Sequence, residues 1–330
     1  MSSPPSQSER GAALLTVLLW VAIVGAITAA ALDRLRLSTK VSVNASSIGQ
    51  ARALSAGVEE LLVLMVDDLN RNNETPQRGS FSLIQGERNI RLPLGAKSRI
   101  TLMDGGNCFN INSVAQGDDP SKLTRRPEGI AQFNSLMIFL GVPADEAHTI
   151  ADAAGDWVDA DEQDEAGGLE DAHYAQSANP YRVGNTLFTD VSELRAVAGM
   201  TATRFDQLRP WLCALPTTDL SPININTIRS DQAPLLAMLA PDQISVARAR
   251  EILSGRPLGG WHSLSDFDQV PAMKAVVLPG LVQFQLQLQT GWLRGEILTT
   301  YQQAEVSETI LIDGRAVPSR MAVRHWGDEE

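Results

Sequence analysis

The densest group of chemically reactive side chains in this 330-residue chain is an acidic segment at residues 155–174. If Asp159 takes the first position of a calcium loop of the EF-hand type, Asp161 takes the third and Glu170 the twelfth, positions that supply oxygen ligands. The sixth position, where an EF-hand has glycine, is Asp164. The pattern therefore predicts a calcium loop of another kind, and the alternative is a solvated acidic loop without an ion.

The negative charge of the chain is concentrated in the same region. The formal net charge is −12, and residues 127–181 contain 12 acidic side chains with no lysine or arginine. Like charges at this density repel one another, so a compact fold there requires neutralisation. The acidic balance also argues against nucleic acid and anionic membrane surfaces as partners.

Motifs for catalysis are not found in the sequence. There is no Gly-x-Ser-x-Gly pattern, phosphate-binding loop or dinucleotide fingerprint, and His148 and His173 near the acidic segment are isolated histidines. We therefore predict that the protein is not an enzyme. A calcium-dependent hydrolase is the rival class, because paired carboxylates can also perform acid–base chemistry.

The two cysteines, Cys108 and Cys213, have no metal-ligand spacing with histidine. In an oxidising compartment they would form a disulfide. The alternative is two separate buried thiols, because free cysteine packs as a small apolar side chain.

The N-terminal part must position everything that follows. Residues 11–32 form an apolar run of 22 residues without charge, behind a polar leader. About 20 apolar helical residues span the hydrocarbon core of a bilayer. From 32 to 70 the apolar residues recur with a helical period, and no proline interrupts the chain between the leader and Pro76. We expect one long helix, half in the membrane and half packed on a soluble domain.

The rest of the chain predicts strands, then a large helical region, then strands. Helical periodicity covers 127–215 and 228–281, and the second of these regions resembles a helix-hairpin-helix module. The triplets Asn110–Asn112 and Asn224–Asn226, both Asn-Ile-Asn, indicate turns or helix caps. Strands are expected at 81–84, 88–94, 98–103 and 282–289, and a hairpin turn at Asp313-Gly314.

The predicted fold is of the α+β class. A long N-terminal helix carries a small antiparallel-sheet domain, into which a large all-α domain is inserted, including a helix-hairpin-helix or SAM-like module. The expected units are a leader at 1–11, the membrane and long helix at 12–70, the strand domain at 71–115 with 282–330, the inserted domain at 116–215 and the second helical module at 216–281.

The start of the apolar run, Arg10-Gly11-Ala12 followed by ALLTVLLWVAIV, resembles the class III signal of type IV pilins and type II secretion pseudopilins. The resemblance implies cleavage after Gly11 by a prepilin peptidase, with Ala12 as the mature N-terminus. The apolar helix then stays on the protein as a membrane anchor. The alternative is a signal peptidase acting after 29–31, which would release a periplasmic calcium-binding protein or hydrolase.

The fifth residue of this mature chain is Thr16, where most pilin-like subunits have glutamate. In that family the glutamate pairs with the N-terminal amine of a neighbouring subunit. A buried charge without its partner costs several kcal/mol, so a subunit without that neighbour is better without the charge. Loss of the glutamate is a habit of the minor pseudopilin that caps the fibre.

A second pattern resembles pseudopilin K of type II secretion. It runs through Asp-Trp-Val-Asp-Ala-Asp at 156–161, Gly-Gly-Leu-Glu-Asp at 167–171, Pro-Tyr-Arg at 180–182, and the two asparagine triplets. The resemblance extends from residue 11 to about 284 and implies an inner-membrane, single-pass protein with its C-terminal domain in the periplasm. The positive-inside rule alone favours the opposite orientation.

The same resemblance implies a tip position and a set of partners. These are the I- and J-type minor pseudopilins, the inner-membrane assembly platform, the prepilin peptidase and secreted substrates. It also implies that the acidic segment holds calcium. We expect the carboxylate ligands to be Asp159, Asp161, Asp164, Glu170 and Asp171, with backbone carbonyls completing the shell.

Overall fold

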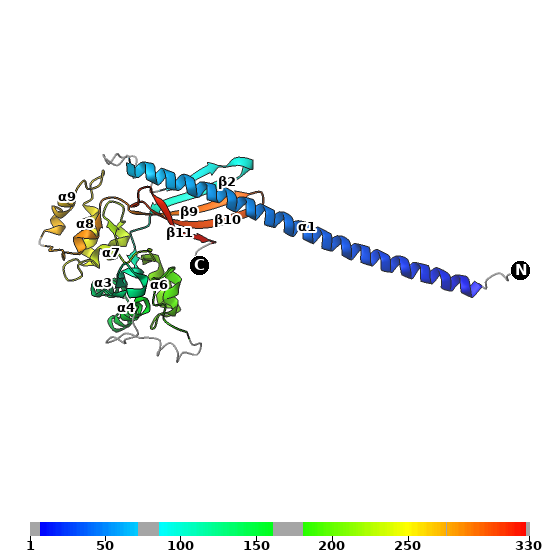
Figure 1. The fold of residues 1–330 in the computed structure, drawn as a ribbon, viewed down its shortest axis with the longest axis horizontal. Coiled ribbons are helices and arrows are strands. Elements are labelled where there is room, and N and C mark those ends of the chain that lie inside the picture. Colours follow the sequence, from blue (N-terminus) through cyan, green and yellow to red (C-terminus); the bar gives the residue numbers. More distant parts are fainter. Residues whose placement is uncertain (1–6, 72–85, 161–180, 275, 328–330) are drawn as a thin grey trace.

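The longest element of the protein is a single helix, α1 (Gln7–Arg71), of 65 residues. The computed structural model describes residues 7–71, 86–160, 181–274 and 276–327, and in it α1 extends far beyond the rest of the molecule (Figure 1). The continuous helix predicted for 32–70 is confirmed. The helix also includes residues 7–11, which the sequence assigns to the leader.

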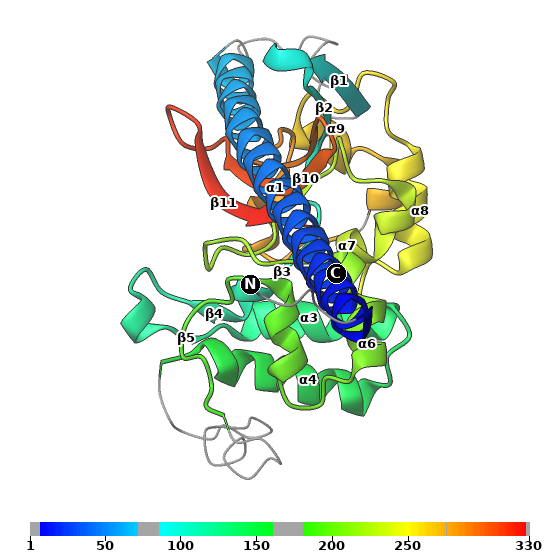
Figure 2. The same ribbon diagram turned by 90° about the vertical axis from the view of Figure 1, so that its right-hand side faces the viewer.

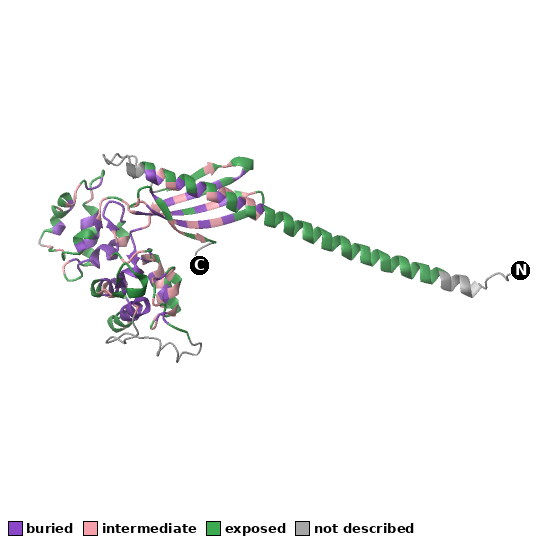
Figure 3. Cartoon of the chain, viewed as in Figure 1, coloured by how far each residue is buried: buried purple, intermediate pink, exposed green. Residues whose placement is uncertain are grey.

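The surroundings of α1 change part of the way along it. Every residue from Leu14 to Ser46 is exposed, and from Ser47 onward one side of the helix is buried (Figure 3). The buried positions Val58, Leu62 and Val66 are four residues apart, which is the spacing of one helix face. The second half of α1 is therefore part of a folded domain, and the first half has no partner within the described chain.

The face of α1 that is buried packs on a five-stranded antiparallel sheet of order β1-β2-β9-β10-β11. The strands are β1 (Gly86–Arg91), β2 (Lys97–Asp104), β9 (Trp292–Tyr301), β10 (Ala304–Asp313) and β11 (Arg320–Trp326). Side chains alternate between the two faces, as in Lys97–Asp104 and Trp292–Tyr301, so the apolar positions gather under α1. Gly295 lies opposite the helix, and the δ1 carbon of Leu62 is 3.5 Å from where a β-carbon would be. Helix and sheet thus pack closely there.

The chain between β2 and β9, residues 105–291, contains a helical block. The block lies beside the distal end of the sheet, meaning the end farther from the N-terminus of α1 (Figures 1 and 2). We call residues 107–217 the first helical module; it contains β3 (Phe109–Asn110), η2 (Ile111–Val114), β4 (Ala115–Gln116), η3 (Pro120–Lys122), β5 (Thr124–Arg125), α3 (Pro127–Phe139), α4 (Ala144–Val158), η4 (Val191–Ala196), α6 (Ala202–Leu208), η5 (Arg209–Trp211) and β6 (Leu212–Cys213). We call residues 223–286 the second helical module; it contains β7 (Ile223–Asn224), η6 (Ser230–Gln232), α7 (Ala233–Ala237), α8 (Val246–Ser254), α9 (Leu264–Asp268), η7 (Pro271–Met273), η8 (Val282–Phe284) and the start of β8 (Leu286–Gln287).

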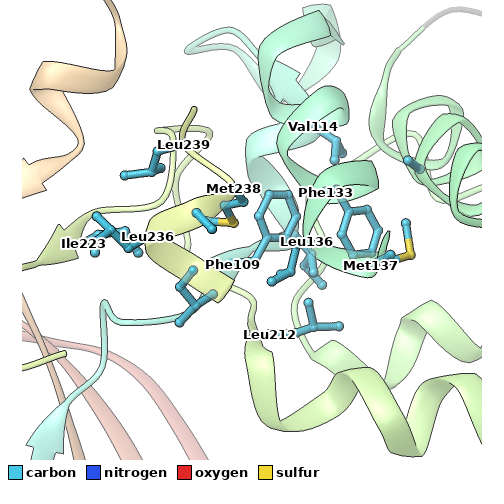
Figure 4. Close-up of a cluster of buried hydrophobic side chains, with 14 of the residues drawn as sticks. Phe109, Val114, Phe133, Leu136, Met137, Leu212, Ile223, Leu236, Met238 and Leu239 are labelled. Atoms are coloured by element: carbon cyan, nitrogen blue, oxygen red, sulfur yellow. The ribbon is translucent and has the colours of Figure 1, made fainter. Parts of the chain in front are cut away.

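One apolar core runs through both helical modules. Phe109 and Phe133 stack with their ring centroids 4.7 Å apart, and Leu236 and Met238 of α7 belong to the same cluster (Figure 4). A separate cluster lies between α1 and the sheet. The predicted α+β class, with helices inserted between the strands of a sheet, is confirmed.

Two strand predictions are wrong in detail. Residues 282–289 alternate in the sequence but form η8 and the two-residue strand β8, because Val282 and Leu286 are buried on one side of a turn and Gln285 is buried with them. The hairpin turn predicted at Asp313-Gly314 is a longer connection, from 314 to 319, between β10 and β11. The run at 88–94 ends as strand at Arg91, and 81–84 lies outside the described residues.

The boundaries of the strand domain also differ from the prediction. Phe109, Ile111 and Val114 from the expected first strand segment, and Leu286 from the second, pack in the core of the helical block. The reason is that β3 pairs with β6 and β7 pairs with β8, so both ends of the insertion are paired within the block. The sheet itself begins at Gly86 and returns at Trp292.

Candidate functional site

The described part of the acidic segment lies at the end of α4. Asp152, Asp156 and Asp159 are four and three residues apart, which puts them on one face of the helix, and all three are buried. Arg125 of β5 lies against this face. One nitrogen of its guanidinium is 2.7 Å from Asp152, and the other donates a hydrogen bond to Asp156. His148 also contacts Asp152, at 3.2 Å.

Arg125 changes the charge argument made from the sequence. The sequence counts 12 acidic residues without a basic one from Pro127 onward, and the neutralising arginine stands two positions before that region. Because β5 runs antiparallel to β4 beside the end of α4, Arg125 reaches two of the carboxylates. These two carboxylates therefore have a counter-charge of their own within the chain.

Asp159 is the one predicted calcium ligand within the described residues. It is the C-terminal cap of α4, with its backbone N–H donating to Gly155 at 3.1 Å, and its side chain is almost fully buried. The C-terminus of a helix is its negative end, where a cation is favoured and a carboxylate is not. A hard oxygen donor in that position suits calcium. Asp161, Asp164, Glu170 and Asp171 lie outside the described residues.

The two ends of the acidic segment are held around one aromatic side chain. Trp157 lies 6.3 Å from Tyr181 and 6.2 Å from Phe188 between ring centroids, and the latter pair is stacked. The backbone N–H of Asn185 donates to the carbonyl of Trp157 at 3.0 Å. Within the described ranges, which stop at residue 160 and resume at 181, no three His, Cys, Asp or Glu side chains are grouped to hold a metal.

The asparagine triplets, which the sequence indicated as turns or helix caps, form such turns, with Asn110 accepting from the N–H of Asn112 and Asn224 from that of Asn226. The last asparagine of each triplet is also a buried clamp. Asn112 accepts a hydrogen bond from the N–H of Phe188 at 2.7 Å and donates to its carbonyl at 2.9 Å. Asn226 does the same with the N–H and carbonyl of Trp261, at 2.8 and 2.9 Å. Each also donates to the chain after the module's parallel strand pair, at Leu215 and Leu288. The two modules thus share one structural plan.

Cys108 and Cys213 form a disulfide, with their α-carbons 5.8 Å apart. The bond adjoins the pairing of β3 with β6 and so closes the first helical module at its base. Of the two alternatives that the sequence left open, the structure has the bonded pair.

The second module is joined to the sheet by Asp104, a residue that no sequence motif identifies. Its carboxylate accepts hydrogen bonds from Thr227 at 2.6 Å, Thr290 at 2.5 Å, Asn224 at 3.0 Å and the N–H of Gly106 at 2.9 Å. The signal that could have found Asp104 is its place at the end of a strand.

A buried carboxylate pair joins α1 to the sheet. Glu59 of α1 and Glu308 of β10 both face Arg324 of β11, and the Arg324 Nε to Glu308 distance is 3.2 Å. Ser55 donates to the other oxygen of Glu308 at 2.6 Å. Burial, together with the hydrogen bond and negative charge of Glu59, raises the pKa of Glu308 to about 7. The sequence carries no signal for this pair, because the two residues are far apart in the chain.

The N-terminal half of α1 is long and apolar enough to cross a membrane, and its most apolar stretch is not buried against the rest of the protein. Thr16 is exposed on this part of the helix, and Gly11 and Ala12 lie in its first turns. The exposed apolar surface is continuous along the helix (Figure 3). Such a surface requires lipid or other apolar helices around it.

Comparison with known proteins gives consistent matches. Models of the type II secretion system protein K family match residues 107–217 and 223–286. A protein K of Pectobacterium carotovorum subsp. carotovorum is 34% identical over 79% of both chains, and that of Klebsiella pneumoniae is 34% identical over 81% of both. The GspK chain in the crystal structure of the GspK-GspI-GspJ complex from enterotoxigenic Escherichia coli is 28% identical. Its TM-score is 0.72, covering 90% of this chain and 100% of that one.

Proposed function

The chain belongs to the type II secretion system protein K family and is a minor pseudopilin of type II secretion; from this premise we propose that it occupies the tip of the pseudopilus. There it takes part in fibre assembly and in export of folded proteins from the periplasm. The observation that carries the tip position is the helical block, which stands to one side of the distal end of α1 and the sheet (Figure 1). A further subunit stacked on this end would have to displace the block.

The anchoring of the protein follows from α1. Its apolar half would lie in the inner membrane after cleavage behind Gly11, with the N-terminus on the cytoplasmic side and the folded part in the periplasm. The Cys108–Cys213 bond suits that oxidising compartment. N-terminal sequencing of the mature protein tests the processing. A chain beginning at Ala12 supports it, and a chain beginning after residue 31 would indicate a signal peptide.

The acidic segment is proposed to hold calcium. Asp159 at the negative end of α4 fits this role by its burial and donor type, and Asp161, Asp164, Glu170 and Asp171 would join it. A bound calcium ion would supply the positive charge that the segment lacks beyond Arg125. The ion would stabilise the segment, whose two ends are already held together by the contacts of Trp157 with Tyr181 and Phe188.

The partners proposed are the I- and J-type minor pseudopilins, since the solved relative was crystallised in a complex with GspI and GspJ. The assembly platform, the prepilin peptidase and the secreted proteins are proposed contacts of the working fibre. In this role the protein assembles and positions other proteins, and it catalyses no reaction. Contact with the neighbours begins at α1, whose apolar half is exposed over its whole circumference.

The experiment that tests the function is complementation of a strain lacking this gene. The wild-type chain should restore secretion and co-purify with the I- and J-type pseudopilins. Thr16→Glu should impair both, because it places an unpaired charge in the membrane at a cost of about 2.5 kcal/mol or more. Full secretion by that variant would argue against a tip position, and Thr16→Ser is the matched control.

A further inference from the structure

The molecule has two arms, one formed by α1 with the sheet and the other by the helical block (Figure 1). Among the described residues, the apolar cluster under α1 and the apolar cluster of the block are separate. A cleft of about 1400 Å³ lies between the block and the face of the sheet opposite α1, and side chains of both arms line it. A shared core therefore does not set the angle between the arms within the described chain. Units joined in this way move relative to one another unless other contacts hold them.

Two short stretches of chain connect the arms. Residues 105–107 lead from β2 into the block, and residues 288–291 lead from β8 back to β9. The stretches meet where the N–H of Gly105 donates to the carbonyl of Trp292 at 2.8 Å. Gly105 begins the first stretch and Gly291 ends the second. Because few residues at the ends of elements absorb a rotation between domains, these two crossings form the hinge about which the arms would turn.

Asp104, the last residue of β2, is bonded to all parts of this junction. Its carboxylate accepts a hydrogen bond from the N–H of Gly106 in the first crossing at 2.9 Å and from the hydroxyl of Thr290 in the second at 2.5 Å. It also accepts from Thr227 and Asn224 of the second module, at 2.6 and 3.0 Å. Hydrogen bonds to a carboxylate are shorter and stronger than those between neutral groups. One side chain of the sheet thus holds both crossings and the block.

The groups that donate to Asp104 are also bonded to one another. The side-chain amide of Asn224 donates to Thr290 at 2.9 Å. Asn107, in the first crossing, donates from its side chain to Thr227 at 2.8 Å and accepts from the backbone N–H of Asn224 at 2.8 Å. Asn107, Asn224 and Thr227 are buried. A buried polar network in which every member is satisfied specifies one arrangement, and removal of its central acceptor releases several donors at once.

A weaker link between the arms comes from Arg315, in the connection between β10 and β11. Its guanidinium lies 4.2 Å from the ring centroid of Trp292 and 3.0 Å from Asp313 of the same arm. It also reaches Asp219, between the two helical modules, at 3.1 Å. The side chains of Arg315 and Asp219 are 43% and 64% exposed, so water and salt screen this pair. The pair can support the junction at Asp104 but cannot replace it.

We propose that Asp104 locks a hinge between the two arms and so holds the helical block at one fixed angle to α1 and the sheet. Its hydrogen bonds oppose rotation about the two crossings. Without them the block turns as one unit, because both helical modules share a core. The inference goes beyond the proposed function, since it concerns the chain by itself. In a subunit whose α1 is held in a fibre, the lock determines the direction in which the block stands.

Distances between spin labels, measured by pulsed electron paramagnetic resonance, test the lock. The full-length chain in detergent, without partner proteins, carries pairs of labels at three exposed positions: Thr300 of the sheet, Ala131 of the first module and Glu251 of the second. Unnatural amino acids carry the labels, so that the bond between Cys108 and Cys213 stays intact. The two pairs that include Thr300 report the angle between the arms, and the third pair reports the block alone.

We expect narrow distance distributions for all three pairs in the wild type. Asp104→Ala should widen both sheet-to-block distributions at least about twofold and leave the distribution within the block unchanged. Asp104→Asn, which keeps one acceptor oxygen without the charge, should give an intermediate width. Arg315→Gln should widen the same two distributions less than Asp104→Ala does. The matched control is Asp118→Ala, which removes an exposed aspartate away from the junction and should behave as the wild type.

The three pairs separate a lock from a general effect on stability. Sheet-to-block distributions that stay as narrow in Asp104→Ala as in the wild type would overturn the lock. Equal widening of all three pairs would overturn it too, because Asp104 would then stabilise the whole fold, and a broad wild-type distribution would show an unlocked hinge. If Asp104→Ala does not fold, Thr290→Val removes one donor at nearly constant shape and should widen the same two distributions. None of these results bears on membership of the fibre, which co-purification with other pseudopilins tests.

Discussion

In the first helical module Asn112 pairs with the backbone of Phe188, and in the second Asn226 pairs in the same way with Trp261. Each asparagine follows a short parallel strand pair, β3 with β6 or β7 with β8. A primary amide has a donor and an acceptor side by side, so it can match one residue's N–H and carbonyl at once. Both modules therefore close around a buried amide rather than around a regular strand ladder.

The modules differ in what is added to this plan. The first has 17 acidic and seven basic residues, a disulfide and the acidic segment, whereas the second has five acidic and five basic residues and no cysteine. The acidic segment begins in the last turn of α4 and ends before Phe188, so that Trp157 and the Asn112 clamp hold the chain on its two sides. The acidic segment is therefore an addition to the shared plan, since the second module has the same clamp without such a segment. We expect the carboxylates of the segment, with calcium bound, to order this part of the first module only.

The largest expected effect comes from breaking what the modules share. Asn112→Ala and Asn226→Ala each leave three backbone groups without their buried partners, and each such group costs about 1–3 kcal/mol. We expect both variants to lose about 4 kcal/mol of unfolding free energy, measured by denaturant titration of the full chain in detergent. Asn89→Ala in β1, which is exposed, is the control and should change stability little. Loss in one module only would show that the clamps are not equivalent.

The next effect concerns the disulfide, which only the first module has. Cys108→Ala with Cys213→Ala removes a crosslink between residues 105 apart in the sequence, for which about 3 kcal/mol is typical. The loss should appear in the first module and leave amide-exchange protection in the second unchanged. Reduction of the wild-type protein is the parallel measurement. Equal loss of protection in both modules would mean that their common core unfolds as one unit.

Calcium should stabilise the first module, which has the acidic segment, and not the second. Binding to the native chain alone would stabilise it by roughly 2.7 kcal/mol at a hundredfold excess over the dissociation constant, with magnesium doing less. Asp159→Asn with Glu170→Gln should abolish the shift in melting temperature. Asp242→Asn with Glu251→Gln, two exposed positions of the second module, is the matched control and should retain it. A wild-type melting temperature indifferent to calcium and chelator would mark the segment as a solvated loop.

The sequence predicted what depends on local pattern. The uninterrupted period from 32 to 70 predicted α1, and the strand-like run at 98–103 predicted β2. It failed where a distant contact overrides the pattern. The alternating run at 282–289 became a turn because Gln285 pairs with Gln132 of α3, and burial of Val282 and Leu286 then decides the backbone.

In the candidate site, too, local patterns were predictable from the sequence and contacts between distant residues were not. Residue types and spacing identified the acidic segment, the cysteine pair and the asparagine triplets. They could not show that Arg125 neutralises Asp152 and Asp156, because that pairing depends on β5 lying beside α4. Nor could they show Glu308 beside Glu59, since neither strand nor helix pattern carries information about which buried polar positions meet.

The smallest effect lies outside both modules, in the Glu59–Glu308 pair between α1 and the sheet, and so tests whether the modules respond separately from the rest. The folded-state pKa of Glu308 is raised to about 7 from an ordinary value near 4.5, so the native state holds this proton more tightly than the unfolded chain. Its contribution is fully present below about pH 4.5 and is lost as the pH rises to about 7 and above. We expect a loss on the order of 1–3 kcal/mol across that window, seen as a falling melting temperature.

Glu308→Gln should flatten the profile, because it keeps a neutral group beside Ser55, whereas Glu305→Gln, exposed on the same strand, should follow the wild type. Amide exchange in β10 and β11 should increase with pH while the clamps at Asn112 and Asn226 stay protected. A profile that Glu308→Gln leaves unchanged would assign the pH dependence to other groups and contradict this role of Glu308.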